Sequence, residues 1–242
     1  MFYSYLEKQF RSNMAESTFE IVQKNRHLLI NYAGEYVLID TGSPTTFHRN
    51  RHIEVCGQTF DVGTSFMGTD LDYISDKVGI EMVGLIGMDV IGKFNVCINT
   101  EKFGNFIGFD TDNHYMTWQV EAFSMMGCPG IVMNVNGRRA RMLFDTGAPV
   151  SYIDSAFTYG IPICGHTKDF TPLTKKEFEV DLHSVPSSFM GKDFIVNYGD
   201  MPESISVLLK TFRVDGIIGY DLMENFRILL QKGVFVLPPQ GI

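Results

Sequence analysis

The chain has 242 residues, of which 45% are hydrophobic, and its 28 acidic residues outnumber 20 basic residues to give a net charge of −8. This length supports one or two domains with a sizeable core, and the acidic balance argues against a nucleic-acid partner, which would need a basic face. No apolar run approaches the roughly 18 residues that a membrane span needs, so we expect no membrane partner. Residues 1–8 have neither the basic nor the long apolar region of a secretory signal, and we therefore expect a cytoplasmic location.

Most of the chain has the pattern of short β-strands. Runs rich in Val, Ile, Phe, Tyr and Thr are broken by Gly, Asn and Pro, and the first clear pair covers residues 28–32 and 35–39. Segments of helical period are scarce, and the two clearest cover residues 70–78 and 203–211. The four cysteines form no Cys-x-x-Cys pair, and we expect reduced, mostly buried thiols. The sequence thus predicts an all-β protein.

The chain contains an internal repeat built around the triplet Asp-Thr-Gly. Residues 28–34 form a strand and a turn, and residues 36–44 form a second strand that runs into the first triplet. Residues 131–137 and 141–149 repeat this pattern and run into the second triplet. A given triplet occurs by chance on the order of 0.05 times in a chain of this length, so two copies at the ends of apolar strands are strong evidence of a duplicated unit.

A second element recurs downstream of each triplet. It consists of two apolar residues and a Gly, followed by a further apolar strand, and its copies cover residues 83–98 and 215–230. The repeat divides the chain into halves at about residues 1–115 and 116–242. No linker rich in Pro, Gly or Ser separates them, so we expect two closely joined lobes rather than independent domains.

Asp40 and Asp145, the acids of the two triplets, are the candidate catalytic residues. A strand delivers each Asp to its loop, the Gly allows a tight turn, and the Thr hydroxyl can lock the loop against its partner. If the loops meet, two carboxyl groups face each other and share one proton, because both cannot ionise cheaply. Such a pair can activate a water molecule as a base and protonate a carbonyl oxygen or leaving amine as an acid. This is peptide hydrolysis without a metal or cofactor.

These motifs resemble the aspartic proteases of the retropepsin and pepsin clan. The resemblance runs from about residue 28 to residue 237 and rests on the two Asp-Thr-Gly loops and the two apolar-apolar-Gly elements. It implies the all-β, two-lobed pepsin/retropepsin-like acid protease fold, with a pseudo-twofold axis and an active-site cleft between the lobes. It also implies an aspartic endopeptidase that takes an extended peptide or protein substrate. Because one chain carries both halves, we expect an active monomer.

The resemblance gives each motif residue a role. Asp40 and Asp145 would be the catalytic pair, and Thr41 and Thr146 would interlock beneath it. The residues that would support the two active-site loops are Thr41, Gly42, Ser43, Thr146, Gly147 and Ala148. The residues that would close each loop from below are Leu85, Ile86, Gly87, Ile217, Ile218 and Gly219.

The two halves depart from the family pattern in several places. Aligning residues 52–60 with residues 183–191 leaves a gap directly after the first Asp-Thr-Gly loop, where the family has its flap hairpin. We therefore expect that the first half has lost its flap and that the second keeps one within residues 157–181. Pepsin-like enzymes carry their flap on the N-terminal lobe, so this placement leaves the substrate polarity open. The basic residue that follows the apolar-apolar-Gly element in retroviral proteases is replaced by Met88 and Tyr220.

Two further expectations concern single positions and the chain ends. Ser43 in the first loop corresponds to Ala148 in the second, and a hydroxyl that hydrogen-bonds to Asp40 would make Asp40 the more readily ionised acid. Residues 2–6 and 234–237 are strand-like, and in retropepsin-type dimers the termini pair in a shared sheet.

Other readings of the sequence carry less weight. Asp110-Thr111-Asp112 superficially resembles a phosphatase motif, but such enzymes need an alternating α/β fold, so a solvated acidic turn is favoured. His48 and His52 are expected at the surface rather than as metal ligands. The alternative to a protease is an inactive peptide-binding or scaffolding module of the same fold, in which both Asp-Thr-Gly loops serve as hydrogen-bonded scaffolding.

Overall fold

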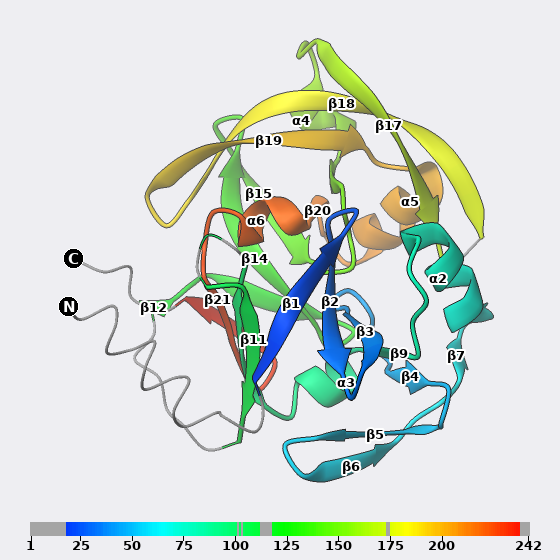
Figure 1. The fold of residues 1–242 in the computed structure, drawn as a ribbon. Coiled ribbons are helices and arrows are strands. Elements are labelled where there is room, and N and C mark those ends of the chain that lie inside the picture. Colours follow the sequence, from blue (N-terminus) through cyan, green and yellow to red (C-terminus); the bar gives the residue numbers. More distant parts are fainter. Residues whose placement is uncertain (1–17, 101, 103, 112–117, 173–174, 238–242) are drawn as a thin grey trace.

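The computed structural model describes residues 18–100, 102, 104–111, 118–172 and 175–237 (Figure 1). Strands far outnumber helices among these residues, which confirms the predicted all-β class. The strands form two large curled sheets and two small hairpins. None of the helices among these residues has the length and apolar character needed to cross a membrane.

The larger sheet has ten strands. In spatial order they are β12 (Trp118–Gln119), β22 (Val234–Leu237), β21 (Ile228–Gln231), β10 (Asn95–Asn99), β11 (Phe106–Asp110), β1 (Thr18–Lys24), β2 (His27–Tyr32), β3 (Glu35–Ile39), β9 (Gly84–Ile86) and β4 (Phe47–His48). The two small hairpins, β5 (His52–Val55) with β6 (Gln58–Asp61) and β7 (Ser65–Phe66) with β8 (Thr69–Asp70), lie between β4 and β9 in sequence.

The second sheet has eight strands. In spatial order they are β13 (Ala122–Met125), β14 (Cys128–Val135), β15 (Arg138–Phe144), β20 (Gly216–Ile218), β16 (Ser151–Ile153), β19 (Lys192–Asp200), β18 (Lys176–Phe189) and β17 (Ile163–Thr171). The helices are short: α2 (Leu71–Val78), α3 (Met88–Ile91), α4 (Ser155–Thr158), α5 (Glu203–Thr211) and α6 (Tyr220–Met223).

The sequence repeat corresponds to a repeated strand arrangement. In the first half β3 runs parallel to β9, and β4 pairs with the other edge of β9 in the antiparallel sense. In the second half β15, β20 and β16 are arranged in the same way. Each Asp-Thr-Gly triplet thus lies in a loop between two strands that flank a third: the first loop joins β3 to β4 on either side of β9, and the second joins β15 to β16 on either side of β20.

Local sequence explains the main turns and helices. The hairpins β2–β3 and β14–β15 each turn on two residues with positive φ, which are Ala33-Gly34 and Asn136-Gly137 and suit the twist of the flanking strands. Helix α2 begins at Asp70, whose carboxylate accepts a hydrogen bond from the backbone N of Tyr73 at 2.9 Å. The helices predicted over residues 70–78 and 203–211 are both confirmed.

The long hairpin of β17 and β18 belongs to the second half. It arches across the top of Figure 1 and descends beside α2 of the first half. Between β4 and β9 the first half has the two short hairpins β5–β6 and β7–β8. The β5–β6 hairpin turns at Cys56-Gly57 as the β18–β19 connection turns at Met190-Gly191, all with positive φ. The first half thus contains a counterpart of the β18–β19 turn, and no hairpin like β17–β18 precedes it among the described residues.

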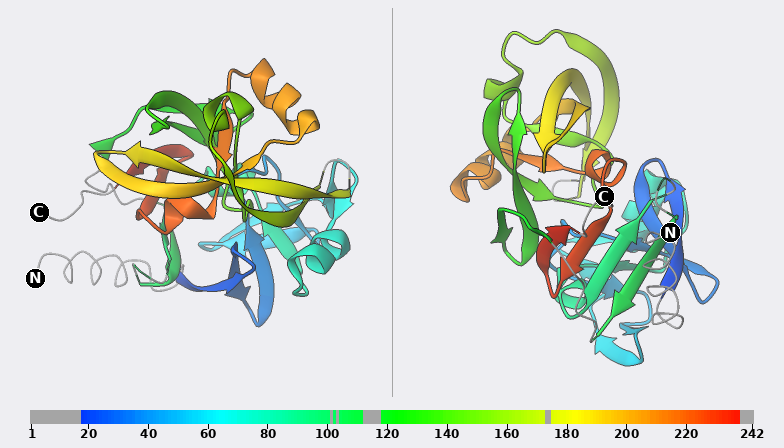
Figure 2. Two further views of the ribbon diagram at one scale, coloured as in Figure 1. Left: turned by 90° about the horizontal axis from the view of Figure 1, so that it is seen from above. Right: turned by 90° about the vertical axis from the view of Figure 1, so that its left-hand side faces the viewer.

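The last two strands of the second half join the sheet of the first. Strand β21 pairs with β10, and β22 pairs with β21 and β12 (Figure 2, right, in red). The predicted pairing of residues 234–237 with residues 2–6 lies outside the described residues, and the partner seen for β22 at that edge is β12. The boundary between the two sheets therefore differs from the boundary between the two halves of the repeat, because β12, β21 and β22 belong to the ten-stranded sheet.

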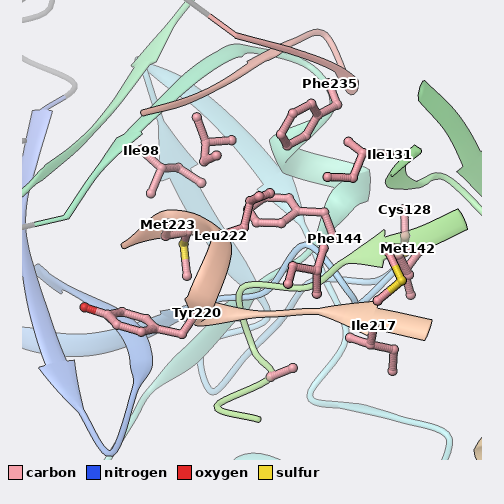
Figure 3. Packing of buried hydrophobic residues seen from close by; sticks show 14 of the residues in the cluster. Ile98, Cys128, Ile131, Met142, Phe144, Ile217, Tyr220, Leu222, Met223 and Phe235 are labelled. Carbon is pink, nitrogen blue, oxygen red and sulfur yellow. The ribbon is translucent and has the colours of Figure 1, made fainter. Parts of the chain in front are cut away.

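One continuous core connects the two halves. Phe144 of β15 packs edge-to-face on Phe235 of β22, with ring centroids 5.3 Å apart. Figure 3 shows Ile98, Ile131 and Leu222 in the same cluster, contributed by β10, β14 and α6. Because both halves contribute to this cluster, the free energy gained by burying it also holds the two halves together.

The four cysteines are free thiols, as predicted. Cys97 and Cys128 are buried, Cys56 is half-buried and Cys164 is exposed, so burial is less general than expected.

Candidate active site

The two predicted catalytic acids lie at equivalent positions in the fold. Each follows the last residue of its strand, and its backbone is held by the neighbouring parallel strand. The backbone N of Asp40 donates to the carbonyl of Ile86 at 3.0 Å, and that of Asp145 donates to the carbonyl of Ile218 at 3.1 Å. The residues Leu85, Ile86, Ile217 and Ile218 are all buried, so each carboxyl group stands on a rigid base.

Each loop turns its backbone amides toward its own carboxylate. The amides of Gly42 and Ser43 donate to Oδ1 of Asp40, both at 2.9 Å. The amide of Gly147 donates to Oδ1 of Asp145 at 2.8 Å, and the amide of Ala148 also contributes. These bonds fix the direction of both carboxyl groups and favour their ionised forms.

The two carboxyl groups meet and hydrogen-bond to each other. Burial, together with the charge of Asp145, raises the pKa of Asp40 well above its usual range. Burial likewise raises the pKa of Asp145. Both residues are nevertheless partly exposed to solvent. The arrangement suits one proton shared between two carboxyl groups that water can reach.

The glycines of the triplets allow this close approach. A Cβ atom on Gly42 would lie 2.2 Å from Cγ of Asp145, and one on Gly147 would lie 2.7 Å from Cγ of Asp40. Each Gly therefore lies directly against the opposite acid, and no larger residue fits at either position without moving a carboxyl group.

Thr41 and Thr146 form a reciprocal lock beneath the acids. The backbone N of each donates to the hydroxyl oxygen of the other at 3.0 Å. The Thr41 hydroxyl donates to the carbonyl of Phe144 at 2.9 Å, and the Thr146 hydroxyl donates to the carbonyl of Ile39 at 2.7 Å. Both threonines have an exposed fraction of 0%, so the four hydrogen bonds are shielded from water.

Gly87 and Gly219 lie under the two loops. A Cβ on Gly87 would be 2.7 Å from the carbonyl of Thr45, and one on Gly219 would be 2.2 Å from the carbonyl oxygen of Ala148. The following amides, those of Met88 and Tyr220, donate to the carbonyls of Ser43 at 2.8 Å and of Ala148 at 3.3 Å. The apolar-apolar-Gly elements thus contact both active-site loops from below.

Two hydroxyl–carboxylate pairs that sequence reasoning missed tie these elements together. Thr46 Oγ1 accepts from the amide of Gly87 at 2.9 Å and donates to Asp89 at 2.5 Å. In the second half, Ser151 Oγ accepts from the amide of Gly219 at 3.1 Å and donates to Asp221 at 2.6 Å. The repeat contained the signal, because each hydroxyl lies six positions after the Asp of its Asp-Thr-Gly triplet and each carboxylate lies two positions after its Gly.

A basic residue reaches this network from the opposite half. Arg26, in the β1–β2 turn, forms an ion pair with Oδ1 of Asp221 at 2.8 Å, and its guanidinium lies 4.9 Å from the ring centroid of Tyr220. The position after Gly219 lacks the basic residue of retroviral proteases, and here a cation from the first half lies over the residue that replaces it.

The expected role of Ser43 is wrong. Its hydroxyl donates to the carbonyl of Thr45 at 2.8 Å, and a hydroxyl has only one proton to donate, so it is not available as a donor to Asp40. Only the backbone amide of Ser43 contacts that carboxylate.

The long hairpin is fastened to the first half near its tip. The Thr69 hydroxyl donates to the carbonyl of Pro172 at 2.6 Å, and Phe170 packs edge-to-face on Tyr73 with centroids 5.9 Å apart. An exposed ion pair joins Lys77 to Glu177 at 2.8 Å. The hairpin thus bridges from the second half to α2 and the β7–β8 hairpin of the first half.

Cys128 lies beside the acids and was not anticipated as part of the site. Its thiol donates to the carbonyl of Gly42 at 3.4 Å. Burial, followed by the charges of Asp145 and Asp40, raises the pKa of Cys128 to about 12. The thiol therefore stays protonated near neutral pH and is a packing residue rather than a nucleophile.

The remaining candidates lie away from the acids. His52 is exposed as predicted, but His48 is buried, because its ring packs over Gly84, where a Cβ would lie 2.6 Å from its Cδ2. Asp110 ends β11, and Asp112 lies outside the described residues. Within the described part of the chain, no three His, Cys, Asp or Glu side chains cluster as potential metal ligands.

Comparison with protein-family models gives no match to this chain, and comparison with curated proteins gives none either.

Proposed function

We propose that this chain is an aspartic endopeptidase of the retropepsin and pepsin type, with Asp40 and Asp145 as its catalytic pair. The observation that carries the proposal is the hydrogen-bonded pair of partly exposed carboxyl groups, held by two equivalent loops. Two neighbouring acids with raised pKa values are costly for folding, so their presence in duplicate loops supports a catalytic role.

The proposed reaction uses the shared proton in both directions. The ionised carboxylate takes a proton from a water molecule as the water oxygen bonds to the carbon of the peptide carbonyl, while the protonated carboxyl gives its proton to the carbonyl oxygen. The tetrahedral intermediate then collapses. Its C–N bond breaks, the amine nitrogen takes a proton from the carboxyl that received one, and the other carboxyl is reprotonated from the intermediate. No cofactor or covalent intermediate is needed.

The proposal includes the two-lobed pepsin/retropepsin-like fold, with the long hairpin as the flap. A peptide would lie in extended form between the catalytic pair and β17–β18, and its backbone would pair with the hairpin. The flap belongs to the second half, so the substrate would run in the opposite sense from that in pepsin-like enzymes. One chain supplies both acids, and we therefore propose an active monomer, which gel filtration of the active species near 27.4 kDa would support.

The test compares the wild-type protein with two single variants, Asp40→Asn and Asp145→Asn. Each is incubated with a diverse peptide mixture between about pH 4 and pH 7.5, and the products are read by mass spectrometry. Asn keeps the shape of Asp and removes the shared proton, so we expect the loss of a general acid–base group to lower turnover by at least about 10²-fold. Asp193→Asn makes the same change at an exposed position on β19 and should cleave like the wild type.

Cleavage by the wild type and by Asp193→Asn, but by neither dyad variant, would support the proposal. Cleavage that survives in both dyad variants would overturn it. Folded wild-type protein that binds peptides without cleaving them would favour the alternative, an inactive peptide-binding module.

A further inference from the structure

A third acid, Asp169, lies on the long hairpin close to the catalytic pair. Its partner Tyr152 lies in β16 opposite Ile217 of β20, and β20 also holds the backbone of Asp145. The charge of Asp169 also contributes to the raised pKa of Asp145. The Tyr152 hydroxyl donates to Oδ2 of Asp169, and the backbone N of Phe170 donates to its Oδ1 at 2.8 Å. The direction of the Asp169 carboxylate is therefore fixed.

The residues around Asp169 supply hydrogen bonds but no cation. No Lys or Arg in the described part of the chain forms an ion pair with it, and the two lysines near the hairpin tip, Lys77 and Lys175, pair with other acids. His27 is the basic group whose charge bears on Asp169, but burial lowers the pKa of His27 and keeps it neutral near pH 7. Burial raises the pKa of Asp169 itself, and a cation bound to it would favour its ionised form.

A carboxylate in this position is better suited to a ligand than to the fold. A largely buried acid without a cation destabilises a protein unless something compensates its charge. The Tyr152 hydroxyl and one amide occupy only part of its acceptor capacity, because an ionised carboxylate can accept about four hydrogen bonds. Asp169 is partly exposed, so a ligand can reach it.

We propose that Asp169 is a specificity-determining residue that binds a basic side chain, Lys or Arg, next to the peptide bond to be cleaved. The inference rests on the proposed function. An ammonium or guanidinium group would fill the remaining acceptor positions of the carboxylate and neutralise the charge beside the catalytic pair. The substrates would then be peptides with a basic residue close to the scissile bond.

The test uses matched peptides that carry Lys or norleucine at one of the four positions on either side of a cleaved bond. We expect the wild type to show, at one of these positions, a kcat/KM at least about tenfold higher for Lys, since such a charge-assisted contact is worth more than 1.4 kcal/mol. In Asp169→Asn the ratio should fall to near one. Asn keeps an acceptor for the Tyr152 hydroxyl and removes only the charge.

Two controls separate recognition from support of the hairpin. Asp181→Asn removes a carboxylate on the same hairpin that pairs with His166, and it should keep the wild-type ratio. Tyr152→Phe removes the hydroxyl but not the Asp169 charge, so the preference for Lys should remain. Equal rates for Lys and norleucine in the wild type, or a preference that persists in Asp169→Asn, would overturn the proposal.

Binding of uncleavable peptides makes the two proposals distinguishable. Hydroxyethylene isosteres carry no charge at the scissile position, and a Lys and a norleucine version are compared by calorimetry with wild type and Asp169→Asn. A preference for Lys in binding, without any cleavage of the peptides, would sink the protease and leave the role of Asp169 standing. Cleavage without any Lys preference would support the protease and overturn the role of Asp169. If neither isostere binds, the role of Asp169 is overturned as well.

Discussion

Thr41 and Thr146 make the same pair of hydrogen bonds to each other in opposite directions, each amide donating to the other hydroxyl oxygen at 3.0 Å. The two residues are far apart in sequence and come from different halves of the chain. Because each hydroxyl also donates to the carbonyl two residues before the other threonine, neither loop can shift without breaking bonds in both. The lock therefore fixes the position of Asp40 relative to Asp145.

Removing one hydroxyl of the lock should destabilise the whole chain. Thr41→Val is nearly isosteric and leaves the amide of Thr146 and the carbonyl of Phe144 buried without this partner. We expect a loss of about 2 kcal/mol in the free energy of unfolding, measured by urea denaturation. Thr41→Ser keeps the hydroxyl, so it should retain most of the stability that Thr41→Val loses. Equal losses in the two variants would show that the methyl group, not the hydroxyl, matters.

Gly42→Ala should damage activity more than folding. Its Cβ would lie 2.2 Å from Cγ of Asp145 and must displace that carboxyl group. A displacement near 1 Å at a reacting group can cost about 10²-fold in rate, and we expect a fall in kcat/KM of that order. The control is Gly165→Ala on β17, where the nearest atom to the new Cβ is Leu182 Cδ1 at 3.9 Å. Wild-type turnover by Gly42→Ala would contradict the observed packing of the two loops.

The Asp40–Asp145 pair should make the folded protein less stable as pH rises. Burial raises the pKa of Asp40 and Asp145, so the folded chain holds a proton more tightly than the unfolded chain. That proton stabilises the fold below the ordinary Asp pKa of about 4, and the contribution is lost as pH rises through the folded-state pKa. Asp40→Asn removes the cost of ionising a carboxyl group in this desolvated position, so its Tm should exceed that of the wild type at pH 7.

The difference in Tm between Asp40→Asn and the wild type should shrink toward pH 4, where the wild-type carboxyl groups become protonated in both states. Thermal unfolding at pH 4, 5.5 and 7 measures this trend, with Asp193→Asn as the exposed control. A gain that stays constant with pH, or a lower Tm for Asp40→Asn at pH 7, would contradict the assignment of a raised pKa.

Thr69 should control how often the long hairpin leaves the first half. Its buried hydroxyl donates to the carbonyl of Pro172 at 2.6 Å, and Thr69→Val removes that bond. A hydrogen bond is worth about 1 kcal/mol, so hydrogen exchange of amides near the ends of β17 and β18 should speed up roughly fivefold. Exchange in β14 and β15 should not change. Lys77→Met, which removes an exposed ion pair, should have a smaller effect.

The sequence was informative where the repeat carried the signal. Asp40 and Asp145 were found because short apolar strands and Asp-Thr-Gly occur twice, and α2 and α5 because their apolar residues have helical spacing. The structure brings the two acids together, along with both threonines and both apolar-apolar-Gly elements. These features depend on local sequence and on symmetry, which one chain can reveal.

Other features depend on contacts between distant residues and could not be read from a pattern. The ion pair between Arg26 and Asp221 joins the two halves, and nothing near either residue in sequence indicates it. The sequence does not say whether the Ser43 hydroxyl donates to the Asp40 carboxylate or to a backbone carbonyl. Only the loop geometry shows that it donates to the carbonyl of Thr45. His48 was expected at the surface, whereas it is buried because its ring packs over Gly84 on β9.

The placement of β21 and β22 has a consequence for biosynthesis. These strands are made late, yet they pair with β10 and pack Phe235 against Phe144 in the shared core. During translation one edge of β10 therefore stays unpaired until residues 228–237 have left the ribosome. A nascent chain that still lacks these strands therefore cannot complete the core that both halves share.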